Sequence, residues 1–430
     1  MTTSRPRLSG KWRTLAPIAA SAAFLLSACQ SVPLTPEPPT QTHTERWVAT
    51  WASSPSISIA GDSAPPGMRS PQLEGTVRYV MRVSAGGERV RIVLDGGSSI
   101  SRLSIGAATI ALASGDGIDV RTLRSLTFSG HPDVLSVSAS APVWSDPADL
   151  SVPDGGVVVV SLYLREPVRA APADKQMVVE MAKGANQTHE PVLAGAERFV
   201  ARPLVTTVHA DNPGVSRVIV ALGDSITDGT GSTDPLMRGW PDYLAARMHA
   251  EGMTHVAIAN HGIGGNRLLQ DSVGRSALAR FDRDVLAMPG VTDVIIMAGI
   301  NDLGLSGLSL PWMTEPFPVL GAKEITAAYS QLIARARAHG IRAIGATLTP
   351  DLGTPFPGYA TEEKEVIRNE INDWIRNSGA FDAVIDFDMA VRDPENPQYL
   401  SEKYDVGDRL HPSDAGYKAM AEAVDLDLFR

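Results

Sequence analysis

A serine and a histidine–aspartate pair lie near opposite ends of the second half of the sequence, and together they have the side chains that acyl transfer requires. Ser225 stands in the sequence LGDSITDG (222–229), and Asp408 and His411 lie three residues apart in DRLHP (408–412). A nucleophilic serine needs a base that accepts its proton, and the base needs a carboxylate that holds its tautomer. We therefore consider Ser225, His411 and Asp408 as candidates for these three roles.

Each of the two motifs also has a purely structural explanation. Ser and Asp are the usual N-cap residues where a strand turns into a helix, so the turn around Ser225 alone is equally typical of a helix cap. It is not the G-x-S-x-G turn of the α/β-hydrolases, because Thr227 occupies the position of the last glycine. A lone histidine before a helix, as His411 is before a helix predicted to run from Pro412, is often a capping or surface residue.

The elements that must position these residues follow from the apolar pattern after Asp211. Apolar runs alternate with stretches of helical period, such as Ile325, Tyr329, Leu332, Ile333 and Ala336. We predict five parallel strands in a doubly wound α/β sheet, whose ligands bind at the carboxyl ends of the strands. The five predicted strands are 215–222, 255–259, 291–298, 341–348 and 383–387.

Two further segments follow predicted strands at this edge of the sheet. The second strand runs into NHGIGGNR (260–267), and the third runs into AGIND (298–302). Glycines let backbone N–H groups approach a ligand closely, and a side-chain amide at a strand end can donate a hydrogen bond. Of the nine histidines, only His411 combines an aspartate three residues earlier with a place at this edge.

The four strand-end segments, in the order Ser, Gly, Asn and Asp-x-x-His, resemble the four blocks of the SGNH (GDSL) hydrolase family over roughly residues 215–428. The resemblance implies a flavodoxin-like α/β fold and a serine esterase. It makes Ser225 the nucleophile, His411 the general base and then acid, and Asp408 the residue that orients His411.

The resemblance also implies an oxyanion hole. Its donors would be the backbone N–H groups of Ser225 and Gly265 and the side-chain amide of Asn301, with Gly264 as the alternative to Gly265. Each missing donor in such a hole costs about 10²–10³ in rate, so a complete set favours a working enzyme.

The first half of the folded chain has a different pattern. Val77, Tyr79, Met81 and Val83 alternate with polar residues, and the alternation resumes over 90–94. Short apolar runs recur at 123–128, 134–137 and 157–164, without a long amphipathic helix. We predict a β-sandwich of jelly-roll kind over residues 46–210, followed by the hydrolase domain over 211–430.

The N-terminus is typical of an exported lipoprotein. Residues 1–28 have a basic start and an uncharged apolar stretch, which predicts a signal peptide. The sequence LSAC resembles a bacterial lipobox, in which Cys29, the only cysteine of the chain, would carry the lipid. Residues 29–45, rich in Pro and Thr, predict a tether. By resemblance to enterobacterial lipoprotein sorting, Gln30 after the cysteine implies the outer membrane, facing either the periplasm or the surface.

Charge limits the partners. Residues 1–28 contain four basic and no acidic side chains, so their removal changes the net charge from −10 to −14. Such a chain is a poor candidate for nucleic acid or an anionic membrane surface, and its only expected membrane contact is the lipid anchor. No cluster of His, Asp and Glu has metal-ligand spacing, so we expect neither a metal nor an organic cofactor. The oligomeric state is not predicted.

The substrate is predicted less closely than the chemistry. The segments 303–321 and 351–360 leave the third and fourth strands and bring aromatic residues over the site, where these would stack on sugar rings or line an acyl pocket. The order of a β-sandwich before the hydrolase domain is similar to bacterial carbohydrate esterases, which favours short-chain, O-acetyl esters on a carbohydrate. Two alternatives are a lysophospholipase or aryl esterase and a non-catalytic glycan-binding lipoprotein. The candidates for substrate contact are Asn266, Arg267, Trp240 and Trp312.

Overall fold

The computed structural model describes residues 45–56, 71–95, 103–135, 141–171, 177–309 and 315–430. The predicted signal peptide, Cys29 and nearly all of the predicted tether lie outside these residues. By their internal contacts, residues 44–430 form one unit. None of the helices in the described ranges combines the length and the apolar character that a membrane span requires.

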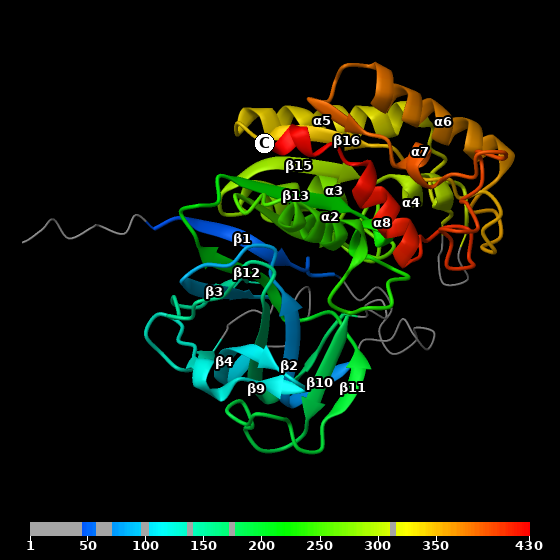
Figure 1. Ribbon diagram of the computed structural model, residues 1–430. Helices are drawn as coiled ribbons and strands as arrows, with labels where there is room; N and C mark the ends of the chain where they lie inside the picture. The colour runs from blue at the N-terminus through cyan, green and yellow to red at the C-terminus, as the bar shows by residue number, and fades with distance from the viewer. Residues whose placement is uncertain (1–44, 57–70, 96–102, 136–140, 172–176, 310–314) are drawn as a thin grey trace, which may run out of the picture. The chain divides into compact units, whose positions relative to one another are not determined.

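The second half of the chain is built on a five-stranded parallel sheet (Figure 1). Its strand order is β14-β13-β15-β16-β17, so after β14 the chain crosses to the other side of β13 to add the remaining strands. In such sheets, ligands bind at the carboxyl ends of the strands beside this point. The strands are β13 (Arg217–Gly223), β14 (Val256–Gly262), β15 (Val291–Met297), β16 (Arg342–Ala346) and β17 (Ala383–Ile385). The predicted five-stranded doubly wound fold is confirmed, and every strand lies within three residues of its predicted bounds.

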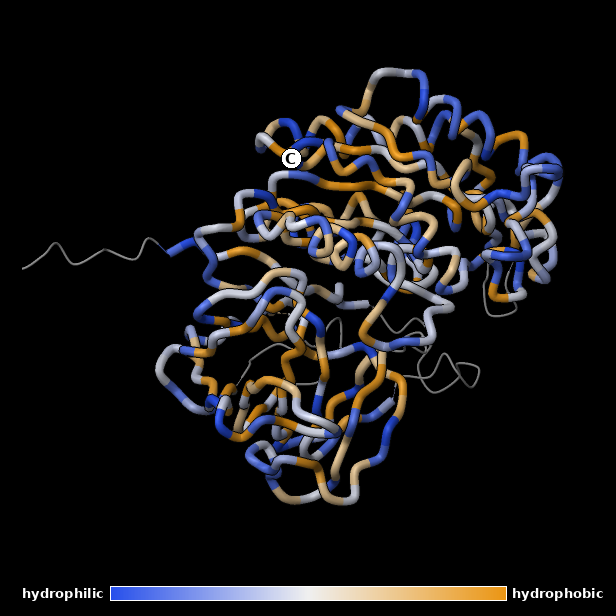
Figure 2. The backbone as a smooth tube through the Cα atoms, viewed as in Figure 1, coloured by the Kyte–Doolittle hydropathy of each residue, from blue (hydrophilic) through white to orange (hydrophobic). Residues whose placement is uncertain are grey.

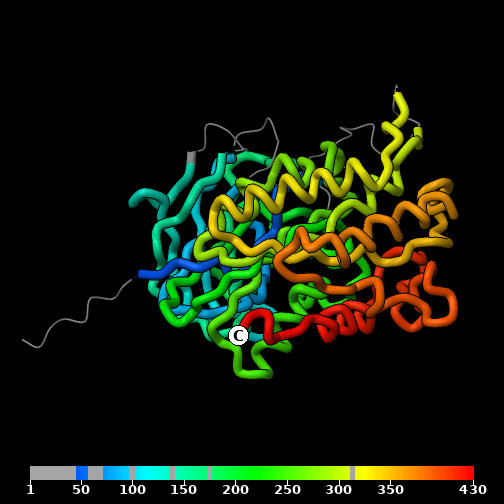
Figure 3. Tube along the Cα trace, turned by 90° about the horizontal axis from the view of Figure 1, so that it is seen from above, coloured from blue at the N-terminus to red at the C-terminus, as the bar shows by residue number. Residues whose placement is uncertain are grey.

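Helices cover both faces of this sheet. On one face α3, α5 and α6 pack on Val220, Leu222, Val294 and Ile296, and on the other α2, α7 and α8 pack on Ile219, Ala221 and Ile295. In Figure 3, α5 (yellow) and α8 (red) accordingly lie on opposite sides. The helices are α1 (Ser225–Asp228), α2 (Gly239–Ala250), α3 (Ala277–Phe281) with a π-helical turn (Asp282–Leu286), α4 (Ile300–Leu305), α5 (Ala322–Ala338), α6 (Glu362–Asn377), α7 (Phe387–Val391), α8 (Asp414–Ala423) and a 3₁₀ turn (Leu426–Phe429).

The sequence explains why these elements form. Strands β13 and β15 are buried from both sides over residues 218–222 and 294–297, and these residues are apolar without alternation (Figure 2). Helix α5 buries Ile325, Tyr329, Leu332, Ile333 and Ala336, the residues whose helical spacing predicted it. Helix α8 begins at Asp414 with Ser413 as its N-cap, two residues later than predicted from Pro412.

The first half of the chain consists of two antiparallel sheets, as the alternating pattern predicted. The four-stranded sheet has the order β1-β12-β3-β8, and the larger sheet has the path β11-β10-β2-β9-β4-β5, with β6 and β7 paired to β4. Their longer strands are β1 (Trp47–Ala52), β2 (Gln72–Arg82), β3 (Arg89–Leu94), β4 (Ser104–Ser114), β9 (Val157–Arg169), β10 (Val178–Ala182), β11 (Glu197–Val200) and β12 (Val205–Asp211). The two-residue strands are β5 (Gly117–Ile118), β6 (Arg124–Ser125), β7 (Val134–Leu135) and β8 (Val143–Trp144), and a 3₁₀ turn spans Val120–Thr122.

The apolar core of this β region extends into the parallel sheet. Val218 of β13 and Ala257 and Ala259 of β14 belong to the same buried cluster as Val48, Ile92 and Val208. The backbone N–H of Ala49 donates to the carbonyl of Pro289 at 3.0 Å, and the Ser84 hydroxyl bonds to both backbone groups of Ile258 at 2.8 Å. The two halves of the chain are therefore joined by packing as well as by the connection between β12 and β13.

Candidate active site

The turn after β13 places Ser225 at the start of a helix. Asp224 caps α1, since its carboxylate accepts the backbone N–H of Ile226 at 3.1 Å, and Ser225 is the first helical residue. Gly223 has no room for a side chain, because a Cβ there would lie 2.1 Å from the Thr227 hydroxyl. The helix-cap explanation therefore applies to Asp224, and it leaves the Ser225 hydroxyl available for a different partner.

That partner is His411. The Ser225 hydroxyl lies 2.9 Å from Nε2 of His411, and Nδ1 of His411 lies 2.7 Å from Oδ2 of Asp408. The other carboxylate oxygen of Asp408 accepts the backbone N–H groups of His411 at 2.8 Å and of Leu410 at 3.0 Å. The structure thus brings together residues 186 positions apart in the geometry that a serine nucleophile and its base require.

The loop around Asp408 is held from within. Oδ1 of Asp405 accepts the backbone N–H groups of Gly407, Asp408 and Arg409 at 2.8 to 3.2 Å. Arg409 has a φ of 59°, a left-handed backbone conformation that residues other than glycine rarely adopt. Burial raises the pKa of Asp408, but the hydrogen bonds from the His411 ring and backbone outweigh it, so this pKa is lowered overall. Asp408 is therefore ionised at neutral pH, as a carboxylate that orients an imidazole must be.

Asn301, at the start of α4, faces the segment after β14. Its side-chain amide donates to the carbonyl of Asn266 at 3.0 Å, and its side-chain oxygen accepts the Tyr359 hydroxyl at 2.8 Å. An amide nitrogen has two N–H groups, so one donor remains for another acceptor. Gly265, which precedes Asn266, has a φ of 69°, and a Cβ on it would lie 2.8 Å from the Val273 side chain. Gly265 thus requires glycine, whereas Gly264 does not have a positive φ.

The segment after β14 is also tied to α4 through a buried carboxylate. Asp302 accepts the backbone N–H groups of Leu268 at 2.5 Å and of Leu269 at 2.9 Å. Ser225 adds a third element, because the backbone N–H of the first residue of a helix has no acceptor within the helix. The described residues therefore contain all three groups that the resemblance assigned to an oxyanion hole, on segments linked by hydrogen bonds.

Two residues of the site were not found by sequence reasoning in the roles they have. Tyr359 belongs to the segment 351–360, whose aromatic residues were expected to stack on sugar rings or line an acyl pocket, but it is buried against Gly304 and its hydroxyl donates to the side-chain oxygen of Asn301. Asp224 is fully buried next to Ser225, and burial raises the pKa of its carboxyl group to about 7. A Cβ at position 304 would lie 2.2 Å from the Tyr359 ring, so this packing requires glycine there, but the sequence alone does not pair the two residues.

Trp240, Asn266 and Arg267, which were predicted to contact substrate, have no exposed surface in the structure. Trp240 is fully buried in the core, where its ring packs on Phe387 at a centroid distance of 5.1 Å. Asn266 is also fully buried and bonds to the backbone carbonyl of Arg275. The Arg267 side chain has no exposed surface and lies over the ring of Phe317. Trp240 is therefore part of the apolar core. Trp312, the fourth predicted contact, lies outside the described residues.

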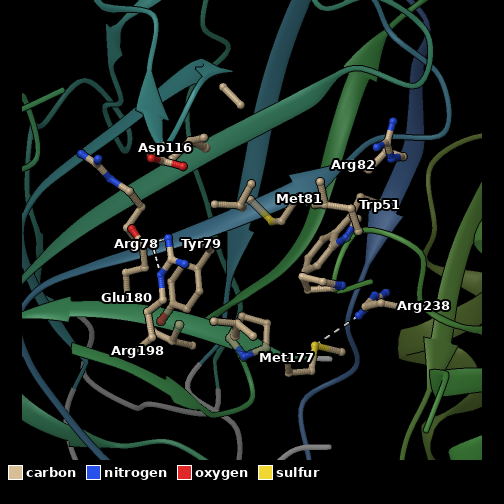
Figure 4. A pocket seen from close by; sticks show the side chains of 18 of the residues that line it. Trp51, Arg78, Tyr79, Met81, Arg82, Asp116, Met177, Glu180, Arg198 and Arg238 are labelled. Atoms are coloured by element: carbon tan, nitrogen blue, oxygen red, sulfur yellow. Dashed lines mark hydrogen bonds and ion pairs between the residues drawn. The ribbon is translucent and has the colours of Figure 1, made fainter. Parts of the chain in front are cut away.

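Two other kinds of ligand site would be a metal site and a pocket away from Ser225. Within the described ranges, no three His, Cys, Asp or Glu side chains are grouped as metal ligands. A pocket of about 240 Å³ lies between strands β2 and β10 and the segment 235–242, where Arg238 donates to the sulfur of Met177 (Figure 4). Its lining includes Trp51, Tyr79 and Asp242 but neither Ser225 nor His411, which hydrogen-bonds to it.

Comparisons with known proteins identify a family for the second half of the chain. Residues 221–419 match the GDSL-like lipase/acylhydrolase family. No curated protein matched the chain. Among solved structures, a variant of an acetyl xylan esterase from Geobacillus stearothermophilus is 27% identical, with a TM-score of 0.36, over 49% of this chain and 93% of that chain.

Two further solved structures align with the same share of this chain. A lipase/acylhydrolase from Enterococcus faecalis is 20% identical, with a TM-score of 0.36, over 48% of this chain and 92% of that one. A GDSL-like lipase from Bacteroides thetaiotaomicron is 19% identical, with a TM-score of 0.35, over 48% of this chain and 85% of that one. In each case the similarity extends over about half of this chain.

Proposed function

We propose that this chain, whose residues 221–419 belong to the GDSL-like lipase/acylhydrolase family, opens acyl esters by nucleophilic attack of Ser225. The observation that carries the proposal is the continuous hydrogen-bonded path from Ser225 through His411 to Asp408, with separations of 2.9 and 2.7 Å. The family accounts for an ester hydrolase, and this path supplies the three residues that would do the chemistry.

In the first step, His411 accepts the proton of the Ser225 hydroxyl at Nε2 while the serine oxygen attacks the ester carbonyl. The imidazolium that forms is stabilised by Asp408, whose lowered pKa keeps it ionised. The carbonyl oxygen becomes an oxyanion, which would accept the remaining amide N–H of Asn301 and the backbone N–H groups of Ser225 and Gly265.

In the second step, His411 donates its proton to the departing alcohol, and the acyl group remains on Ser225. Water then attacks this acyl-enzyme, and His411 takes its proton as a base. The acid is released when the serine recovers its proton, so the histidine ends the cycle in the state in which it began. Each proton is therefore passed between the substrate, water, Ser225 and His411.

We propose a short acyl group, such as acetyl, on a carbohydrate alcohol. The segment that would form a long acyl groove begins at Leu303, yet Leu303 is buried in the core and Leu305 packs against the same cluster. The apolar start of this segment is therefore used in packing. Phe356, on the segment after β16, is 53% exposed, and an exposed aromatic ring of this kind can stack on a sugar.

A lipid or aryl ester is the second candidate, and one observation favours it. Val319, on the segment after α4, is 84% exposed, and together with Phe356 it puts apolar surface on two segments that leave the carboxyl ends of strands. An acyl chain or an aromatic alcohol would contact such side chains as readily as a sugar would.

A panel of nitrophenyl esters from acetate to laurate separates the two candidates. We expect kcat/KM to fall steeply beyond short chains, and an optimum at long chains would favour the lipid candidate. Acetate release from acetylated xylan, mannan and peptidoglycan then tests the alcohol. Ser225→Ala is the control throughout: unchanged hydrolysis would refute Ser225 as the nucleophile, and no hydrolysis by the natural chain would favour a glycan-binding lipoprotein.

We further propose that the chain is exported and anchored through a lipid on Cys29. The support is the basic and apolar sequence of residues 1–28 before the only cysteine. Metabolic labelling with a radioactive fatty acid tests it, since the natural chain would be labelled and Cys29→Ser would not. Labelling of both chains would contradict Cys29 as the attachment site.

A further inference from the structure

The N-terminal β region makes buried polar contacts with the segments that carry the nucleophile and the oxyanion donors. These contacts come from two places in the β region, the segment after β1 and the segment before β12. None of their hydrogen bonds involves Ser225, His411 or Asp408, so they are not part of the proposed chemistry itself.

The first contact is an ion pair between Arg202 and Asp228. Nη2 of Arg202 donates to Oδ2 of Asp228 at 2.8 Å and Nη1 donates to Oδ1 at 3.2 Å, with the two side chains 4% and 1% exposed. Nη1 also donates to the hydroxyl of Ser53, which follows β1. Asp228 is the last residue of the one-turn helix that begins with Ser225. The pair therefore fixes the far end of the nucleophile turn against the β region.

The second contact is made by Ser54, which has no exposed surface. Its hydroxyl donates to Oδ2 of Asp284 at 2.9 Å, lies 2.8 Å from Nδ1 of His261, and accepts Nη1 of Arg280 at 3.1 Å. Asp284 in turn accepts Nη1 of Arg280 at 2.9 Å. One serine of the β region thus holds a buried arginine–aspartate pair of the hydrolase half.

Arg280 connects this pair to the catalytic segments. Its Nη2 donates to the carbonyl of Gly223, two residues before the nucleophile, at 2.8 Å. Its Nη1 donates to the carbonyl of His261 at the end of β14 at 2.6 Å, and its Nε donates to the side chain of Asn266 at 3.1 Å. The carbonyl of Asn266 is the acceptor that holds the Asn301 amide. Arg280 therefore joins the ends of β13 and β14 and the segment of the proposed oxyanion hole.

We propose that the N-terminal β region is a positioning element of the active site, acting through Ser54 on Arg280 and through Arg202 on Asp228. This inference rests on the proposed function, because it assigns these residues to the alignment of Ser225 with its oxyanion donors. A charged network that is almost fully buried has few alternative arrangements, so it can hold backbone carbonyls to within the tolerance that such donors require. The β region then affects the rate of the chemical step rather than the binding of the ester.

The test compares a substitution of Ser54 with a control substitution of a second buried serine of the β region. Ser54→Ala removes the hydroxyl that reaches Arg280. Ser84→Ala removes another buried hydroxyl of the β region, which bonds to the backbone of Ile258 in the middle of β14 and so joins the same two halves away from the catalytic ends. We expect kcat to fall about tenfold in Ser54→Ala, with KM within twofold, and both constants to stay within twofold of the natural values in Ser84→Ala.

A second pair of variants keeps the test decisive if Ser54→Ala does not fold. Arg202→Lys keeps the charge but loses the bidentate hydrogen bonds to Asp228. Arg89→Lys is its control, because it makes the same change in an arginine that binds the buried Asp211 within the β region. We expect the loss of kcat in Arg202→Lys alone. Equal thermal stability losses with unchanged kcat in both would overturn the inference and leave Arg202 a structural residue.

The rate at which a fluorophosphonate labels Ser225 separates this inference from the proposed function. The reagent reacts with a serine that its base activates and places its phosphoryl oxygen among the oxyanion donors, so its rate should fall in Ser54→Ala and Arg202→Lys but not in their matched controls. Labelling of the natural chain and all variants at one rate would overturn the inference alone. Failure to label Ser225 in the natural chain would refute the proposed function, and with it the positioning role of the β region.

Discussion

Replacement of Asp408 by asparagine should abolish most of the activity by reversing the tautomer of His411. Oδ1 of Asp408 accepts two backbone N–H groups, from Leu410 and His411, while Oδ2 accepts Nδ1 of His411. An asparagine has one oxygen, and the two backbone donors would hold it at the position of Oδ1. Its NH₂ group would then face Nδ1 of His411, which would have to become an acceptor.

The expected loss of kcat follows from the tautomer of the His411 imidazole. With Nδ1 unprotonated, a neutral His411 carries its proton on Nε2 and cannot accept the proton of Ser225, 2.9 Å away. The same substitution in the Ser–His–Asp triad of a serine protease lowers kcat about 10⁴-fold, equivalent to about 5.5 kcal/mol at about 1.36 kcal/mol per tenfold change. We expect a loss of about 10³–10⁴ in kcat for this chain, with KM little changed.

The assay is steady-state hydrolysis of nitrophenyl acetate across pH 5 to 10. Asp405→Asn is the matched control, because its side-chain oxygen would still accept the N–H groups of Gly407, Asp408 and Arg409 and keep the loop in place. We expect the control to remain within about threefold of the natural rate, since it loses only a partly exposed ion pair. A loss of less than tenfold in Asp408→Asn would refute the assignment of Asp408, and an equal loss in both variants would mean that loop geometry is the cause.

Three other substitutions should each change either the kinetics or the stability of the chain. Tyr359→Phe should lower kcat about tenfold with KM unchanged in steady-state kinetics, because the oxygen of the Asn301 amide loses its donor; an unchanged kcat would contradict this. Trp240→Ala should cost about 3–5 kcal/mol in urea unfolding with KM unchanged, because the side chain is fully buried, and a raised KM would restore it as a substrate contact. Asp224 has a pKa raised from 3.8 to about 7, so the folded state binds more protons than the unfolded state and stability falls as the pH rises from about 4 to about 7. Asp224→Asn should remove this fall, on the order of 4 kcal/mol, from urea unfolding measured between pH 4 and 8, and an unchanged pH dependence would contradict it.

The parallel sheet could be predicted from the sequence because its strands are buried on both faces. Such strands are uninterrupted apolar runs, and the helices between them show a period of their own, so element type and order followed directly. The antiparallel region was predicted only as a class. Strand β4 carries Gly106 and several alanines rather than an alternation of large apolar and polar residues, and it was not recognised, although it is among the longest strands of the region.

The candidate residues for the chemistry could be predicted because their spacing is local. Asp408 and His411 are three residues apart, and Ser225 follows directly on a strand, so the edge of the sheet was enough to bring them together. Substrate contacts have no such local signature. Trp240 was chosen for its residue type, but an aromatic ring near a site is equally suited to the core beneath it, and only the packing against Phe387 decides between the two.

The contacts that join the two halves were beyond sequence reasoning for a further reason. Periodicity indicates which face of an element is buried but not which residue it is buried against, and Ser54 and Asp284 are 230 positions apart. Breaking one partner of a buried ion pair typically costs about 3–5 kcal/mol, because the other charge stays in a low-dielectric site. Asp228 has its counter-charge, Arg202, in the other predicted domain. The boundary predicted at residue 211 therefore separates two patterns of residues in the sequence. In the structure it separates a buried carboxylate of the hydrolase half from its counter-charge, so the stability of the hydrolase half depends on the β region.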